Sequence, residues 1–169
     1  MAALILLDVD GVLNPSVVSD RAAGGHRLVL DADRAALVAR LAAVGTIVWA
    51  TTWPPELTSV LARDLQLPEG TEAIVFRGGL PRDARFPGAT GKLQPVALWL
   101  ERARETAPID AVVWIDDNLR EDAYAWAREQ ATPFHLVRPD PAEGITAGEV
   151  AGAEEFLTAL APSSGDIGE

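Results

Sequence analysis

Residues 4–14 read LILLDVDGVLN, and this stretch decides the expected fold. Four apolar residues run into two carboxylates, Asp8 and Asp10, and Gly11 follows at once. A short apolar run is typical of a buried strand, and side chains two residues apart project to the same side of an extended chain. Glycine permits a sharp turn directly after them. The stretch therefore predicts a first strand that ends in two neighbouring acidic groups.

Further short apolar runs alternate with segments of helical period along the rest of the chain. We predict strands at Leu4–Asp8, Thr46–Thr51, Glu72–Phe76, Ala111–Asp116 and Pro133–Arg138. We predict helices at Asp33–Val44, Pro54–Asp64, Leu93–Thr106, Arg120–Ala131 and, from a capping-box pattern at Thr146, to about Leu160. This alternation predicts an open α/β domain: a parallel, Rossmann-like sheet of about five strands with helices on both faces.

The length of 169 residues suits one domain, which we place at residues 1–161, with a flexible C-terminal tail at 162–169. Segments 14–30 and 77–91 have neither strand nor helix patterns and are long for connections in a compact domain. We therefore expect both segments to be flaps beside a functional site. Three arginines, at positions 77, 82 and 85, cluster in the second flap.

Charge and composition limit the partners and the location. The formal net charge is −11, and an acidic surface repels phosphate backbones and anionic lipid, so nucleic acid is not favoured as a partner. The chain has no cysteine, which excludes disulfides and thiolate metal sites. The first apolar run is too short for a membrane span. We expect a soluble, cytoplasmic protein without membrane contact.

Polar residues follow two further predicted strands at their carboxyl ends. The second strand ends in Thr51 and Thr52; one hydroxyl can cap the helix that follows, which leaves Thr51 free for a ligand oxygen. The fourth strand runs into Asp116 and Asp117, of which one can be a helix cap. Lys92 directly precedes a predicted helix, and the helix dipole disfavours a cation at that position. A lysine placed there can instead bind an anion.

These residues come from separate segments, and the predicted topology brings them to one edge of the sheet. In open α/β sheets the ligand site lies beyond the carboxyl ends of the strands. Carboxylates gathered there repel one another unless a cation is bound, and oxygen ligands of this kind suit Mg²⁺. The sequence therefore predicts a magnesium-dependent site that binds an anion.

The set resembles the haloacid dehalogenase-like (HAD) superfamily of phosphohydrolases, over most of the chain. The stretch from Asp8 to Asn14 resembles the first family motif, and Thr51 resembles the second. Lys92 has the position of the third motif, and the pair Asp116 and Asp117 resembles the acidic fourth motif. Neither flap is long enough to form the cap domain that many family members carry, so the resemblance implies a minimal-cap type with an open site.

The resemblance implies a Mg²⁺-dependent phosphatase that forms an aspartyl-phosphate. Asp8 would be the nucleophile, Asp10 the general acid and base, and Thr51 and Lys92 would hold the phosphoryl oxygens. The candidate substrate-binding residues are Thr51, Thr52, Lys92 and Gly11, and the candidate metal-binding residues are Asp8, Asp10 (through its backbone carbonyl), Asp116 and Asp117. Thr51 is preferred over Thr52, and the two adjacent aspartates remain able to exchange roles.

The implied substrate is a phosphorylated molecule, either small or a macromolecule with an accessible phosphate. Transfer to an acceptor other than water is an alternative to hydrolysis, and a non-catalytic HAD-like binding domain is another. A response-regulator receiver also carries acids, a threonine and a lysine at strand ends. Receivers, however, place the lysine after the last strand, whereas Lys92 precedes the fourth predicted strand.

Overall fold

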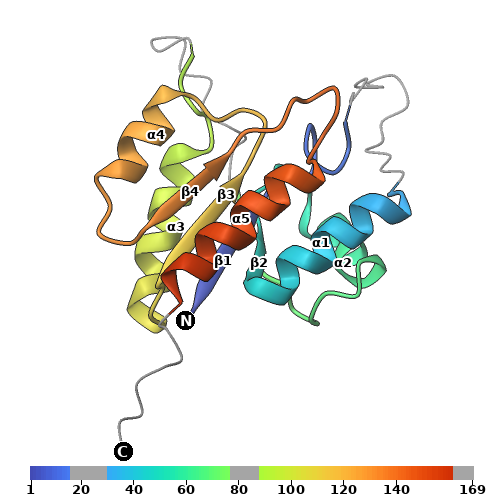
Figure 1. Ribbon diagram of the computed structural model, residues 1–169, viewed down its shortest axis with the longest axis horizontal. Coiled ribbons are helices and arrows are strands. Elements are labelled where there is room, and N and C mark those ends of the chain that lie inside the picture. The colour runs from blue at the N-terminus through green and yellow to red at the C-terminus, as the bar shows by residue number, and fades with distance from the viewer. Residues whose placement is uncertain (16–29, 77–87, 162–169) are drawn as a thin grey trace, which may run out of the picture.

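The computed structural model describes residues 1–15, 30–76 and 88–161. Its described residues form one parallel sheet of four strands in the order β2-β1-β3-β4 (Figure 1). The strands are β1 (Ala3–Leu7), β2 (Thr46–Trp49), β3 (Ala111–Ile115) and β4 (Phe134–Val137). The register pairs Leu7 with Trp49 on one side and with Ile115 on the other. The three strands therefore end at the same level, and the residues that follow them share one edge.

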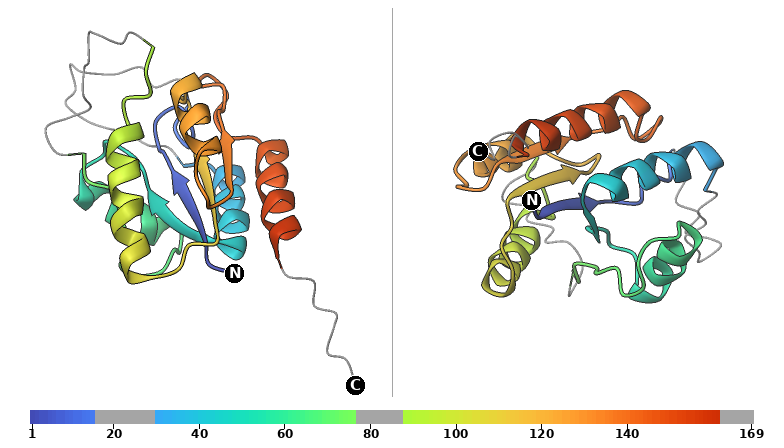
Figure 2. Two further views of the ribbon diagram at one scale, coloured as in Figure 1. Left: turned by 90° about the vertical axis from the view of Figure 1, so that its left-hand side faces the viewer. Right: turned by 60° about the horizontal axis from the view of Figure 1, so that its bottom comes forward.

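Helices cover both faces of this sheet. They are α1 (Ala32–Val44), α2 (Pro55–Asp64), α3 (Leu93–Thr106), α4 (Glu121–Arg128) and α5 (Ala147–Leu160). Helices α1 and α5 lie together on one face and α3 lies on the other, while α2 lies on the β2 side of the sheet (Figure 2). The predicted capping box is confirmed: Thr146 Oγ1 accepts from the Glu149 N–H, and the Glu149 side chain accepts from the Thr146 N–H.

The buried side chains alternate between the two faces, as expected of strands covered on both sides. Ile5 and Leu7 of β1 point into a cluster that includes residues of α1, α2 and α5. Leu6 points into a second cluster that includes residues of α3 and α4. Trp49 and Trp114 are fully buried and belong to the first and second cluster respectively.

The predicted α/β fold is confirmed, but one predicted strand is wrong. Segment 72–76 makes only an isolated bridge, Trp49 with Ala73, in which Trp49 exchanges two hydrogen bonds with Glu72 and Ile74. The pairing does not continue to a second residue of β2, so the segment forms no strand. Helix α4 ends at Arg128, three residues earlier than predicted, and Gln130 then donates its side-chain N–H to the Trp126 carbonyl.

Most of the two predicted flaps lies outside the described residues, as do Arg77, Arg82, Arg85 and the tail 162–169. Among the described residues there is no second sheet or separate cap domain. No helix in the described ranges is both long enough and apolar enough to cross a membrane.

Candidate active site

Two buried carboxylates follow the central strands β1 and β3. The backbone N–H of Asp8 donates to the Ile115 carbonyl at 3.0 Å, and that of Asp116 donates to the Val137 carbonyl at 3.1 Å. The ladder hydrogen bonds thus continue one residue beyond each strand and hold both residues in place. Asp8 is 5% exposed and Asp116 is fully buried. Burying two carboxylates side by side is unfavourable unless positive charge accompanies them.

Asp117 completes a group of three carboxylates. One oxygen each from Asp8, Asp116 and Asp117 lie within 4.8 Å of one another. These hard oxygen donors follow two adjacent strands, β1 and β3. Asp117 is half-buried, so the group is partly accessible to solvent. Such a donor set fits Mg²⁺, which binds through one or two carboxylates and retains water.

Lys92 supplies positive charge to the same pair of strands. Its Nζ lies 2.5 Å from Asp8 Oδ2 and donates to Asp116 Oδ2 at 2.8 Å. The lysine is itself only 6% exposed, and it is the only lysine in the chain. It is the residue directly before α3, so the predicted position at the mouth of that helix is confirmed.

Burial and charge shift the titration of this group. Burial raises the pKa of Asp8 from 3.8 to about 7, although the charge of Lys92 acts in the opposite direction. Burial also raises the pKa of Asp117, and the neighbouring charge of Asp116 adds to the rise. For Lys92, burial alone would lower the pKa, but the charges of Asp8 and Asp116 outweigh it and raise the pKa. The lysine therefore stays charged at neutral pH.

A tight turn follows β1 and brings Gly11 against Asp117. The Val9 carbonyl accepts from the N–H groups of Leu13 and Asn14, at 2.8 and 2.9 Å. Gly11 has φ +75°, a conformation that glycine adopts without strain. A Cβ at Gly11 would lie 2.5 Å from Cγ of Asp117. The glycine is thus required both for the turn and for the space that Asp117 occupies.

The two threonines after β2 differ in burial. Thr51 is 3% exposed, whereas Thr52 is exposed. The expected cap on α2 is not formed, because Pro54 is the cap residue and no side chain caps this helix. The Thr51 hydroxyl instead accepts a long hydrogen bond, 3.4 Å, from the backbone N–H of Trp53. Thr51 is therefore the buried one of the two, just beyond the carboxyl end of β2.

The side chain of Asp10 is not among the three carboxylates that come together. Its Oδ1 accepts from Asn14 Nδ2 at 3.1 Å, and its Oδ2 accepts from the indole Nε1 of Trp53 at 2.9 Å. The chain has left the extended conformation at this point, and Asp10 bridges to Asn14 within the turn. The sequence patterns do not predict the hydrogen bond between Asp10 and Asn14, although Asn14 lies within residues 4–14, on which the expected fold depends.

Thr90 and Asp122 form a second contact that the sequence did not predict. Asp122 accepts from both the backbone N–H and the hydroxyl of Thr90, at 2.9 and 2.7 Å. The Thr90 hydroxyl in turn accepts from the backbone N–H of Arg120 at 2.8 Å. Thr90 is buried, and it lies two residues before Lys92. The first turn of α4 thereby anchors the loop that carries the lysine.

The neighbouring polar residues after β3 have structural partners of their own. Asp116 Oδ1 accepts from the backbone N–H of Asn118 at 2.9 Å, which closes a local turn. No side chain caps α4, for which Arg120 is the cap residue. Glu121 is exposed in the first turn of that helix, where its charge suits the helix dipole.

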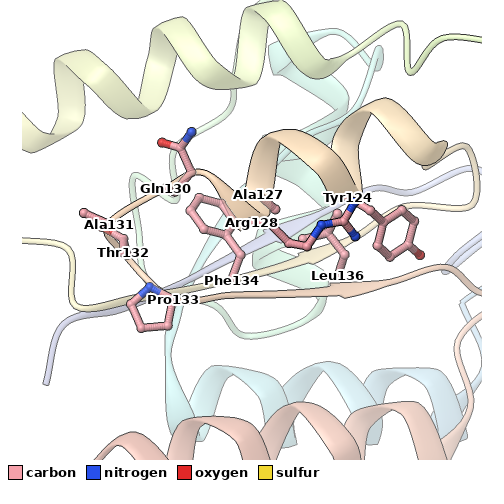
Figure 3. Close-up of a pocket in the computed structure, with 9 residues that line it drawn as sticks. All are labelled: Tyr124, Ala127, Arg128, Gln130, Ala131, Thr132, Pro133, Phe134 and Leu136. Carbon is pink, nitrogen blue, oxygen red and sulfur yellow. The ribbon is translucent and has the colours of Figure 1, made fainter.

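A pocket of ≈ 340 Å³ lies elsewhere, between the second half of α4 and β4 (Figure 3). It is lined by Tyr124, Ala127, Arg128, Gln130, Ala131, Thr132, Pro133, Phe134 and Leu136. None of these residues is a predicted site residue, and none carries a carboxylate. The pocket reaches the start of β4, at the opposite end of the strand from Asp116.

A model of the family described as "HAD domain in Swiss Army Knife RNA repair proteins" matches residues 4–150. The match begins in β1, ends in α5 and includes every predicted site residue. Comparisons with curated proteins and with solved structures found no match.

Proposed function

Because the chain belongs to the HAD superfamily, in the family of HAD domains described for Swiss Army Knife RNA repair proteins, we propose that it is a Mg²⁺-dependent phosphatase. The family supports a phosphatase-type hydrolase in general terms. The observation that carries the finer proposal is the convergence of Asp8, Asp116 and Asp117 around one point, with Lys92 beside them. The local turn at Asn118 engages only Oδ1 of Asp116 and does not account for the convergence of the three carboxylates.

The reaction we propose has two displacements at phosphorus. In the first, an oxygen of Asp8 attacks phosphorus, the bond to the leaving oxygen breaks, and Asp10 gives that oxygen a proton. In the second, water attacks the aspartyl-phosphate, Asp10 takes a proton from the water, and the bond between phosphorus and Asp8 breaks. Inorganic phosphate and the free carboxylate of Asp8 remain, and Asp10 is again protonated.

The remaining residues would stabilise charge around these steps. Asp8, Asp116 and the backbone carbonyl of Asp10 would hold the metal, with Asp117 orienting its shell through water. When bound, Mg²⁺ would reduce the repulsion between the nucleophile and the phosphate. The Lys92 ammonium and the Thr51 hydroxyl would bind phosphoryl oxygens as negative charge is redistributed.

Hydrolysis of an aryl phosphate, with Mg²⁺ and with EDTA, tests this proposal. We expect turnover only with the metal, and we expect Asp8→Asn to abolish it. Asp33→Asn is the matched control, because Asp33 is an exposed carboxylate in the first turn of α1. Turnover that persists in Asp8→Asn would overturn the covalent mechanism. Adding an alcohol to the assay separates hydrolysis from phosphotransfer, since transfer would yield the alcohol's phosphate ester.

The second candidate is narrower and concerns the substrate: a terminal phosphate on RNA. The net charge of −11 disfavours nucleic acid as a general partner, but the family description names RNA repair. Two exposed arginines also flank the carboxylates. Arg138 Nε donates to the Asp117 carbonyl at 3.2 Å, and Arg120 Nη2 donates to Asn118 Oδ1 at 2.9 Å. Each guanidinium has further N–H groups for an anionic substrate.

A comparison of two substrates with the same terminal phosphate tests this candidate. An oligoribonucleotide should be dephosphorylated with a kcat/KM roughly tenfold above that of the matching mononucleotide, and added salt should reduce the difference. Arg120→Gln and Arg138→Gln should each reduce the preference. Arg63→Gln is the control, because that side chain is 77% exposed at the end of α2. Equal kcat/KM values for the two substrates would favour a small phosphorylated molecule instead.

A further inference from the structure

The Asp10 carboxylate is held at both oxygens by uncharged donors from two different segments. Asn14 Nδ2 binds Oδ1 from within the turn after β1, and the Trp53 indole N–H binds Oδ2 from the segment after β2. Two hydrogen bonds to different oxygens fix the plane of the carboxyl group as well as its position. Each oxygen has two lone pairs, so one hydrogen bond to each leaves capacity for a proton and for a reacting oxygen.

Trp53 is held rigidly by its surroundings, so it can fix the position of a side chain that it binds. The residue is 7% exposed and packs in the larger hydrophobic cluster. Its backbone is restricted because Pro54 follows it. Its backbone N–H also reaches the Thr51 hydroxyl, so one residue connects two proposed site groups, Thr51 and Asp10. Groups held by packed elements keep the geometry that catalysis requires better than groups on exposed side chains.

We propose that Trp53, assisted by Asn14, is a positioning residue that aims Asp10 at the leaving oxygen. This inference rests on the proposed function, in which Asp10 protonates that oxygen. Trp53→Phe removes the indole donor to Asp10 and keeps the backbone N–H that reaches the Thr51 hydroxyl. Its effect should therefore be confined to the step that needs a proton donor.

The leaving group separates positioning of the acid from a merely structural role. An ester of dinitrophenol needs little help from an acid because its leaving oxygen is stable as an anion, whereas phenyl phosphate needs the proton. The ratio kcat/KM includes only the steps up to the aspartyl-phosphate, so it isolates this protonation. Trp53→Phe should lower kcat/KM for phenyl phosphate by about 10- to 100-fold. For dinitrophenyl phosphate we expect a loss below about threefold.

Three further variants make the test complete. Asp10→Asn should show the same dependence on the leaving group, with a larger loss. Trp99→Phe is the matched control, because the Trp99 indole donates to Glu72 Oε1, also at 2.9 Å, but outside the site. Asn14→Ala removes the second donor from a half-buried position, and it carries the same test if Trp53→Phe fails to fold.

The outcomes distinguish this inference from the proposed function beneath it. If Trp53→Phe and Asn14→Ala lower kcat/KM equally for both esters, or for neither ester, the positioning role is overturned. Turnover by the wild-type protein would still support the phosphatase proposal in that case. Wild-type protein that turns over neither ester, or Asp8→Asn protein that retains turnover, would overturn the proposed mechanism and the inference with it. A loss confined to phenyl phosphate in these variants, but absent from Trp99→Phe, supports the positioning role.

Discussion

The Nζ of Lys92 lies 2.5 Å from Oδ2 of Asp8, and both side chains are buried at the sheet edge. The same ammonium binds Asp116, so one cation neutralises charge on the carboxylates that end two adjacent strands. A buried ion pair contributes little net stability while it is intact, but loss of one partner leaves a charge without compensation. The lysine is therefore as important to the folded state as to the proposed chemistry.

Replacing Lys92 with methionine should destabilise the metal-free protein by about 3–5 kcal/mol. Mg²⁺ should restore part of that loss, because it supplies the missing positive charge to Asp8 and Asp116. Urea unfolding in EDTA and in Mg²⁺ measures both effects. The control is Arg40→Met, which breaks a partly exposed ion pair between α1 and Glu154 of α5 and should respond equally in both buffers. An identical loss for Lys92→Met with and without Mg²⁺ would contradict the expectation.

Gly11→Ala should weaken Mg²⁺ binding through Asp117. The new methyl group would occupy the position of the Asp117 carboxylate, 2.5 Å from Cγ, and the φ of +75° adds strain. Gly70→Ala introduces similar strain at φ +81° with no atom within 4 Å. Both variants should lose roughly 1–2 kcal/mol from the backbone conformation, but only Gly11→Ala should lose metal affinity as well. Calorimetric titration with Mg²⁺ compares the two directly.

Mg²⁺ affinity should rise with pH between 5.5 and 8. The pKa of Asp8 is raised to about 7 by burial, so the metal-free carboxyl is largely protonated below that pH and must release its proton to bind a cation. For one displaced proton the slope approaches about tenfold per pH unit. Titration calorimetry in two buffers of different ionisation enthalpy counts the protons released. An affinity that does not change across this range would argue against Asp8 as a ligand.

The raised pKa of Asp8 also determines whether the metal-free protein becomes more or less stable as the pH rises. An acid whose pKa is higher in the folded state stabilises that state when protonated. The contribution of Asp8 is therefore fully present below its ordinary pKa of 3.8 and is lost as the pH rises towards about 7. Urea unfolding of wild-type and Asp8→Asn protein across pH 4–8 tests this, since the difference in their free energies of unfolding should fall as the pH rises.

Thr90→Val should destabilise the protein by about 1–3 kcal/mol, because it leaves a half-buried carboxylate and a backbone N–H short of a partner. The carboxylate is that of Asp122, and the backbone N–H is that of Arg120. The loop before Lys92 should also loosen, which proteolysis or hydrogen exchange would detect. Thr106→Val removes an exposed hydroxyl that binds only a nearby helical carbonyl, so it should change stability much less. Similar unfolding midpoints for the two variants would contradict the role given to Thr90.

The sheet edge was predictable because it depends on strand ends alone. Asp8, Thr51 and Asp116 each follow a short apolar run, and the parallel register of β1, β2 and β3 necessarily brings such residues together. The structure adds differences between adjacent residues that the strand pattern does not contain. Burial separates Thr51 from Thr52, and the contact with Lys92 separates Asp116 from Asp117.

Contacts made by turns and loops were beyond the sequence patterns. The expectation that Asp8 and Asp10 project to the same side assumes an extended chain, but β1 ends at Leu7 and Asp10 lies in the turn. The hydrogen-bond partners of Asp10 and of Thr90 depend on how the turn after β1 and helix α4 are placed in three dimensions. The spacing of residues along the sequence does not determine that placement. Segment 72–76 has the composition of a strand, yet it meets the sheet only at Trp49.

The solitary lysine has a practical consequence for chemistry on the intact protein. Lys92 is the only lysine of the chain, and its ammonium is buried between two carboxylates. Amine-reactive acylating reagents therefore find no exposed lysine side chain on the folded molecule. Acylation of Lys92 requires the site to open, so the rate at which that one residue is labelled reports how often opening occurs.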